Sequence, residues 1–130
     1  MSRVNWPVLR AAAVEAASLA YCPYSGLRVG AAATCPDGRI ITGCNVENAS
    51  FGLSLCAECV LVGQLRLVGA DRLVGVACRS GLGELLMPCG RCRQLLYEHG
   101  GGDCLVDTPR GALPLRDILP DAFGPEDLPR

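Results

Sequence analysis

Hydrophobic and polar residues follow two different periods along this chain, which predicts helices alternating with strands. Three stretches carry apolar residues at helical spacing: residues 6–21, 56–68 and 88–99. Shorter apolar runs bounded by turn residues predict strands at residues 28–35, 39–45, 72–79, 103–108 and 112–115. A Pro-Asp-Gly turn separates the first two of these strands and predicts a β-hairpin.

The order of these elements predicts a single α/β domain. Helices and strands follow one another as α-β-β-α-β-α-β-β, an order typical of a three-layer α/β/α arrangement. A chain of 130 residues can bury a hydrophobic core, and no linker composition divides it. We therefore expect one domain over residues 1–130, with a Pro-rich and only partly ordered tail at residues 119–130.

Composition favours an oligomeric protein of the cytoplasm. Hydrophobic residues make up 50% of the chain and the mean hydropathy is +0.29, an apolar excess that a subunit interface would bury. Glu15 interrupts the apolar stretch at residues 11–20, so we expect no membrane span, and no leader segment is apparent. Nine cysteines, an odd number in a chain too long to need disulfide staples, predict reduced thiols.

The charged residues favour a small molecule as the partner. All twelve basic residues are arginine, and the absence of lysine excludes Schiff-base chemistry. The arginines are scattered and only six residues are aromatic, which argues against a surface that binds nucleic acid.

Two Cys-x-x-Cys pairs, at residues 56–59 and 89–92, are the strongest chemical signal in the sequence. Cys56, Cys89 and Cys92 fall at the first turns of two predicted helices. A helix N-terminus carries positive partial charge and unsatisfied N–H groups, which favour the thiolate over the thiol. Thiolate ligands without a redox requirement indicate zinc.

Two kinds of zinc site are compatible with these pairs. A closed, structural site would use all four cysteines, but 29 residues separate the pairs, more than the roughly 15–20 of zinc ribbons. Cys59 also falls three residues inside an apolar helix, where a cysteine is usually a small buried hydrophobe. An open site would use Cys56, Cys89 and Cys92 and leave the fourth position to water.

In the open site, Glu58 stands two residues from a ligand and within reach of that water. An Ala-Glu pair followed by Pro-Cys-x-x-Cys is the layout of zinc deaminases, in which the glutamate moves protons and does not bind the metal. Zinc-bound hydroxide would attack C4 of a cytosine ring. Glu58 would carry the water's proton to N3 and then assist the amine to leave as ammonia.

Four motifs in the same order resemble those of the small, homotetrameric, zinc-dependent cytidine deaminases of pyrimidine salvage. They are PYSGLRVGAA (23–32), TGCNVENASFGLSLCAE (42–58), MPCGRCRQLL (87–96) and LPDAFGPEDL (119–128). The resemblance covers nearly the whole chain. It implies a mixed five-stranded sheet in an α/β/α sandwich, one Zn²⁺ per subunit, a homotetramer, and deamination of cytidine and 2′-deoxycytidine.

The resemblance also implies roles for residues that the pattern alone would not single out. Asn45 and Glu47 match residues that bind the ribose 3′-hydroxyl, and Ala57 matches a position that contacts the pyrimidine through its backbone. Phe51 and Phe123 match aromatic positions that reach a neighbouring subunit's site. Ala49, in the second motif, completes the expected substrate-binding set.

Two positions depart from the family pattern. Leu27 stands where many relatives have phenylalanine, which predicts weaker binding of the base. Cys59 stands where relatives with three cysteine ligands commonly have an arginine that offsets thiolate charge. Helix dipoles, with Arg91 or Arg93, are candidates for that compensation.

Two other functions remain open at this stage. One is deamination of an aminopyrimidine antibiotic of the blasticidin S type, because those enzymes share the PCGRCRQ motif and a similar length. The other is a non-catalytic protein with a structural four-cysteine zinc site. The NVEN motif and the Ala-Phe pair in the tail favour the nucleoside.

Overall fold

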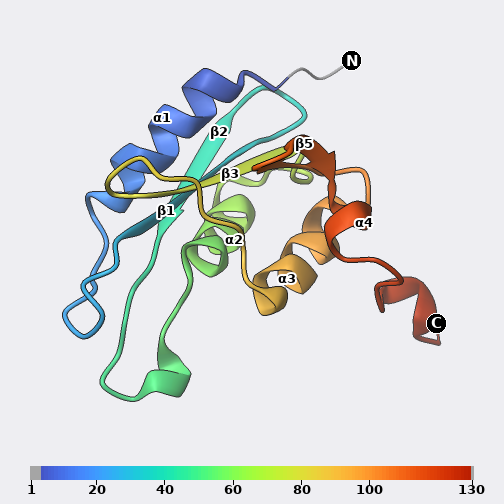
Figure 1. Cartoon of the computed structure of the whole chain (residues 1–130). Coiled ribbons are helices and arrows are strands. Elements are labelled where there is room, and N and C mark those ends of the chain that lie inside the picture. The colour runs from blue at the N-terminus through green and yellow to red at the C-terminus, as the bar shows by residue number, and fades with distance from the viewer. Residues whose placement is uncertain (1–3, 130) are drawn as a thin grey trace.

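The computed structural model describes residues 4–129, which form a five-stranded sheet with helices on both faces (Figure 1). The strands are β1 Val29–Thr34, β2 Ile40–Cys44, β3 Gly75–Ser80, β4 Leu105–Thr108 and β5 Gly111–Pro114. The α-helices are α1 Trp6–Ala17, α2 Ala57–Val68, α3 Gly90–Gly100 and α4 Leu115–Ile118. Two 3₁₀ turns are η1 Phe51–Leu53 and η2 Pro125–Asp127.

The sheet is mixed, as expected. Its strand order is β2-β1-β3-β4-β5; β3 and β4 are parallel, and the other neighbours are antiparallel. The predicted hairpin is β1–β2, with Ala32 opposite Thr42. Gly38 in its turn has φ +89°, a conformation in which glycine avoids the steric cost of a side chain.

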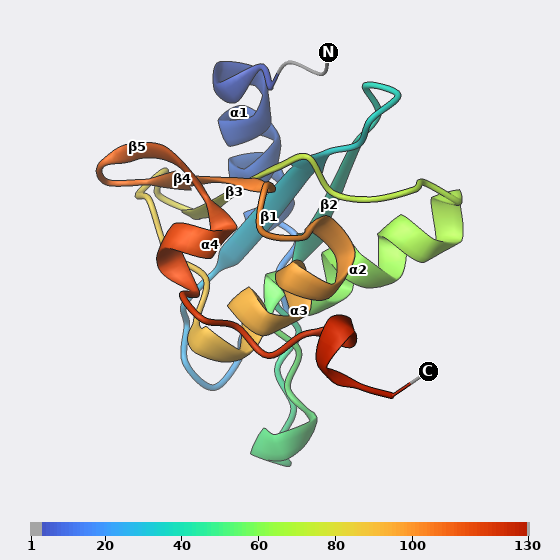
Figure 2. The same cartoon turned by 90° about the vertical axis from the view of Figure 1, so that its right-hand side faces the viewer.

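The helices form one layer on each side of the sheet, which confirms the three-layer prediction. Helix α1 covers one face, while α2 and α3 cover the other (Figures 1 and 2). The larger core lies between the sheet and α2 and α3, and includes the fully buried Leu61, Val76 and Leu96. A smaller cluster under α1 includes Leu9 and Ala13.

The C-terminal segment differs from its prediction. Helix α4 overlaps the end of the last predicted strand, and η2 lies in the tail that was expected to be only partly ordered. Gln94 Nε2 donates to the carbonyl oxygen of Phe123 at 2.8 Å, and the Tyr97 hydroxyl donates to Glu126 at 3.1 Å. These contacts hold the tail against α3. Helix α1 also ends earlier than predicted, at Ala17.

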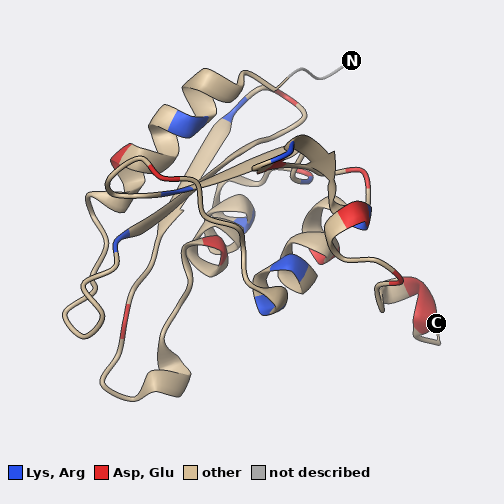
Figure 3. Cartoon of the chain, viewed as in Figure 1, with Lys and Arg blue, Asp and Glu red and all other residues tan. Residues whose placement is uncertain are grey.

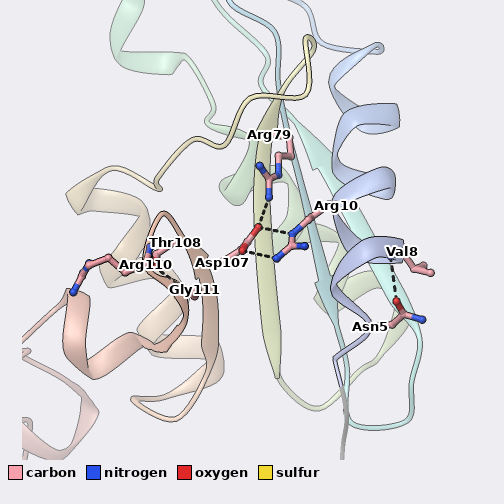
Figure 4. Close-up of polar contacts among 8 residues, drawn as sticks. All are labelled: Asn5, Val8, Arg10, Arg79, Asp107, Thr108, Arg110 and Gly111. Carbon is pink, nitrogen blue, oxygen red and sulfur yellow. Dashed lines mark hydrogen bonds and ion pairs between the residues drawn. The ribbon is translucent and has the colours of Figure 1, made fainter.

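One buried carboxylate connects α1 to the middle of the sheet (Figure 4). Asp107, in β4, is 2% exposed and accepts hydrogen bonds from Nε of Arg10 at 3.0 Å and Nη2 of Arg10 at 3.1 Å. It also accepts from Nη2 of Arg79 in β3. Because a buried charge is costly without partners, this pairing accounts for an aspartate beneath a helix.

Helix α2 approaches β2 so closely that no side chain fits between them at Gly43. A Cβ atom there would lie 2.4 Å from the carbonyl oxygen of Ala57 and 2.5 Å from the backbone nitrogen of Leu61. Both neighbours are backbone atoms, so the overlap could be relieved only by moving the helix away from the strand. Gly43 therefore sets the position of the first turn of α2.

We expect Gly43→Ala to lower the free energy of unfolding by about 1–3 kcal/mol, the usual cost of overpacking a core. Urea denaturation would measure it. Gly63→Ala is the matched control, because a Cβ at Gly63 in the middle of α2 meets nothing within 4 Å. That control should be neutral or slightly stabilising, since alanine favours helix. Equal stability of Gly43→Ala and wild type would contradict the close approach.

Candidate functional site

The predicted cysteine ligands lie at the starts of two helices. Cys56 is the N-cap of α2 and Cys89 is the N-cap of α3, each one position before the first helical residue. Cys92 is the third residue of α3 and is fully buried. Both helices thus direct unpaired N–H groups and a positive dipole end toward the sulfur atoms.

The three sulfur atoms come together as a metal-binding group. The Sγ atoms of Cys56, Cys89 and Cys92 all lie within 4.8 Å of one another. Sulfur ligands about 2.3 Å from a tetrahedral zinc ion would be roughly 3.8 Å apart, so a small adjustment of the side chains suffices. The donor set and its spacing fit one zinc ion.

Cys59 does not belong to this group. It lies in the first turn of α2 and lines a different cavity, together with Val62 and Arg91. The geometry therefore favours the open three-cysteine site over the closed four-cysteine site.

The pKa values of the three thiols are shifted in different directions by their surroundings. The backbone N–H of Cys92 is the main cause that lowers the pKa of the Cys89 thiol below its ordinary value. Burial raises the pKa of Cys56 and, more strongly, that of Cys92, and the charge of Glu58 raises both further. Without metal, Cys89 is therefore the most readily ionised of the three, and zinc binding must displace protons from the others.

One of the two arginines expected to offset thiolate charge, Arg93, donates hydrogen bonds to backbone carbonyl oxygens. Arg93 donates from Nε to the carbonyl oxygen of Pro88 at 2.8 Å and from Nη1 to that of Ile118 at 2.9 Å. It therefore ties the segment before Cys89 to the end of α4. That Arg91 or Arg93 offsets the negative charge of the thiolates in the metal-bound site stays a prediction.

A cavity of about 340 Å³ opens directly over the sulfur group. Glu58, in the first turn of α2, is 4% exposed and lines this cavity beside Ala57. Asn45, Glu47 and Leu27 line it as well. The structure thus brings the predicted metal ligands, the predicted proton carrier and three of the predicted substrate-binding residues to one cavity.

Asn45 and Glu47 fix the loops that border the cavity. Asn45 Oδ1 accepts from the backbone N–H of Val29 at 2.8 Å, and Asn45 Nδ2 donates to the carbonyl oxygen of Leu27 at 2.9 Å. Glu47 Oε1 accepts from the backbone N–H groups of Tyr24 at 2.9 Å and Ser25 at 3.1 Å. The Ser25 hydroxyl also donates to Glu47, which is the main reason that the pKa of Glu47 is lowered.

The other predicted substrate-binding residues lie outside the cavity. Phe51, in η1, is 76% exposed and meets the Tyr24 ring edge to face, with centroids 6.4 Å apart. Phe123 is 59% exposed in the C-terminal segment, and Ala49 is exposed in the loop before η1. The contacts of these three residues with substrate stay a prediction, because Phe51 and Phe123 are expected to reach the site of a neighbouring subunit.

Sequence reasoning missed Cys78, in the central strand β3. It lines the same cavity as Glu58 and is 2% exposed. Its strand is distant in sequence from both Cys-x-x-Cys pairs and carries no motif, so only the fold places it at the site.

Comparison with known proteins gives consistent matches. A family model described as the cytidine and deoxycytidylate deaminase zinc-binding region matches residues 8–108. The chain is 57% identical over 130 residues to a cytidine deaminase of Mycobacterium tuberculosis strain H37Rv, covering 100% of this chain and 98% of that protein. It is 36% identical over 121 residues to a cytidine deaminase of Halalkalibacterium halodurans, covering 89% and 92%.

Solved structures agree with these matches. The crystal structure of the cytidine deaminase from Mycobacterium tuberculosis superposes with a TM-score of 0.92 at 56% identity, covering 94% of this chain and 99% of that one. The cytidine deaminase from Mycobacterium leprae gives a TM-score of 0.89 at 54% identity, covering 92% and 100%.

Within residues 4–129, no helix has the length and apolar character needed to cross a bilayer.

We expect Cys59→Ser to retain zinc at one ion per subunit, whereas Cys56→Ser should lose most of it, because Cys56 belongs to the sulfur group and Cys59 does not. Metal analysis of the purified variants after dialysis would measure this. Loss of zinc from Cys59→Ser would restore the closed four-cysteine site.

Proposed function

This chain belongs to the cytidine and deoxycytidylate deaminase family, and from that premise we propose that it converts cytidine and 2′-deoxycytidine to uridine and 2′-deoxyuridine, with Glu58 as proton shuttle. The observation that carries the proposal is a buried glutamate at the mouth of a three-cysteine group, inside a cavity of nucleoside size.

The proposed reaction needs a Lewis acid, which the metal would supply, and a proton carrier, which the chain would supply. Zinc, when bound by Cys56, Cys89 and Cys92, would supply a Lewis acid that makes water nucleophilic at neutral pH. Glu58 would take up the proton that this water releases and deliver it to N3 of the pyrimidine. It would then take the proton of the hydroxyl group added at C4 and give it to the exocyclic amine, so that a C4 carbonyl forms and ammonia leaves. Glu58 is 4% exposed, which limits the contact of its carboxylate with water to the cavity side.

The remaining lining residues would orient the nucleoside. Asn45 and Glu47 are proposed to bind the ribose, and both are already held in place by hydrogen bonds to the bordering loops. The backbone of Ala57 would contact the pyrimidine. Leu27 lines the cavity with an aliphatic side chain. We propose that it binds the base more weakly than the phenylalanine of many relatives would.

We also propose that the chain works as a homotetramer. Phe51 and Phe123 project from the surface with most of their rings exposed, which supports a role at a neighbouring subunit's site. Nine free cysteines support a reducing compartment, and we propose the cytoplasm.

The alternatives find less support. The relatives described above are cytidine deaminases, which favours a nucleoside over an aminopyrimidine antibiotic. A non-catalytic protein with four cysteine ligands would require Cys59 to join the sulfur group, and Cys59 lines a different cavity.

We expect Glu58→Gln to lower kcat for cytidine by at least about 10³-fold while zinc remains bound, because an amide cannot carry the proton. The fall in ultraviolet absorbance as cytidine becomes uridine would report the rate. Glu98→Gln, on the exposed side of α3, is the matched control and should have wild-type activity. A fully active Glu58→Gln variant would refute the proposed role of Glu58, and an inactive zinc-loaded wild type would refute the substrate.

The charges around the cavity favour a nucleoside over a nucleotide. Within residues 4–129, the only charged side chains that line it are those of Glu47 and Glu58, both acidic. Arg28 is engaged elsewhere, because its Nη1 donates to the carbonyl oxygens of Ser18 and Ala20. Arginine positions are spread over several elements (Figure 3).

Cytidine 5′-monophosphate should therefore be a poor substrate, with kcat/KM at least about 100-fold below that of cytidine, since like charges cost several kcal/mol at an interface. The same absorbance assay with both compounds would measure the ratio. Comparable values for the two would place an unrecognised phosphate-binding group near the cavity.

A further inference from the structure

The carboxylate of Glu58 touches one side chain that no part of the proposed mechanism uses. Sγ of Cys78 lies 3.5 Å from Oε2 of Glu58, within the range of a sulfur hydrogen bond. Glu58 comes from α2 and Cys78 from β3, so the contact joins the helix to the sheet at the floor of the cavity.

The thiol is the donor in this contact. Cys78 is 2% exposed, and its burial, followed by the negative charge of Glu58, raises its pKa well above the ordinary value. It therefore keeps its proton at neutral pH, and the S–H group points its hydrogen at an acceptor. The position of the donor is rigid, because β3 lies in the centre of the sheet and Cys78 pairs with Ala31 of β1.

The two oxygens of Glu58 consequently have different surroundings. Oε2 accepts from Cys78, and Oε1 has no hydrogen-bond partner within the described part of the chain. Among residues 4–129, Nε of Arg79 is the one side-chain nitrogen or oxygen that is both fully buried and unpartnered. Oε1 therefore keeps contact with solvent, through the cavity that Glu58 lines.

We propose that Cys78 is a positioning residue, whose S–H group holds Oε2 of Glu58 so that Oε1 faces the reacting atoms. This inference rests on the proposed function, because it assigns Cys78 a part in the proton transfers of Glu58. A carboxylate that rotates freely would spend part of its time with neither oxygen aimed at the substrate. A weak donor fixes the carboxylate without occupying the oxygen that must exchange protons.

The test compares Cys78→Ala with Cys78→Ser in the zinc-loaded enzyme. Alanine removes the donor, and we expect kcat for cytidine to fall about tenfold with KM changed less than about twofold. Serine keeps an O–H donor and should recover most of the lost kcat after a small shift of the carboxylate. Cys104→Ala is the matched control: Cys104 is also a 2% exposed cysteine of the same core cluster, outside the cavity, and its loss should leave kcat unchanged.

Zinc content and thermal unfolding of each variant separate positioning from folding. A fall in kcat for Cys78→Ala alone, with zinc retained and recovery by serine, would support the proposal. Wild-type kcat in Cys78→Ala, or equal losses in the alanine and serine variants, would overturn it while leaving the deaminase function intact. An inactive wild type would instead refute the proposed function.

Discussion

The site depends on the contact between α2 and β2 at Gly43. With only a hydrogen in place of a side chain, the strand lets the helix backbone settle directly on the sheet. The first turn of that helix carries Glu58, and its N-cap is Cys56. The distance between strand and helix thus determines where a ligand and the proton carrier stand above the cavity floor, before any metal or substrate arrives.

A second consequence of this packing is the charge pattern of the cavity. Two helix N-termini face the sulfur group, and apart from the cysteines the charged side chains that the described part of the chain contributes to the wall are carboxylates. The positive ends of the helices favour thiolates, the thiolates in turn attract a metal ion, and the carboxylates disfavour an anionic substrate. One cavity can therefore hold a cation at its floor and still select a neutral molecule above it.

Sequence periodicity was sufficient to predict the strands and the three longer helices, because each depends on local pattern. The cysteine group was predicted from two Cys-x-x-Cys motifs at helix starts, and the mixed five-stranded sheet was predicted from the family resemblance. Helix α4 was not predicted, because a four-residue helix has too few positions to show a period. The hydrogen bond from Cys78 to Glu58 joins a strand to a helix without any shared motif, so no sequence signal marked it. The substrate roles of Asn45 and Glu47 came only from the family resemblance, since NVEN by itself is typical of a turn.

The hydrogen bonds of Asn45 and Glu47 have a dynamic consequence. One side chain binds Leu27 and Val29, and the other binds Tyr24 and Ser25, so the two loops that border the cavity share their contacts. Neither loop can open locally without breaking the bonds of the other. Backbone amides in both should therefore exchange with deuterium as one cooperative unit, and the wall of the cavity behaves as a single foldon.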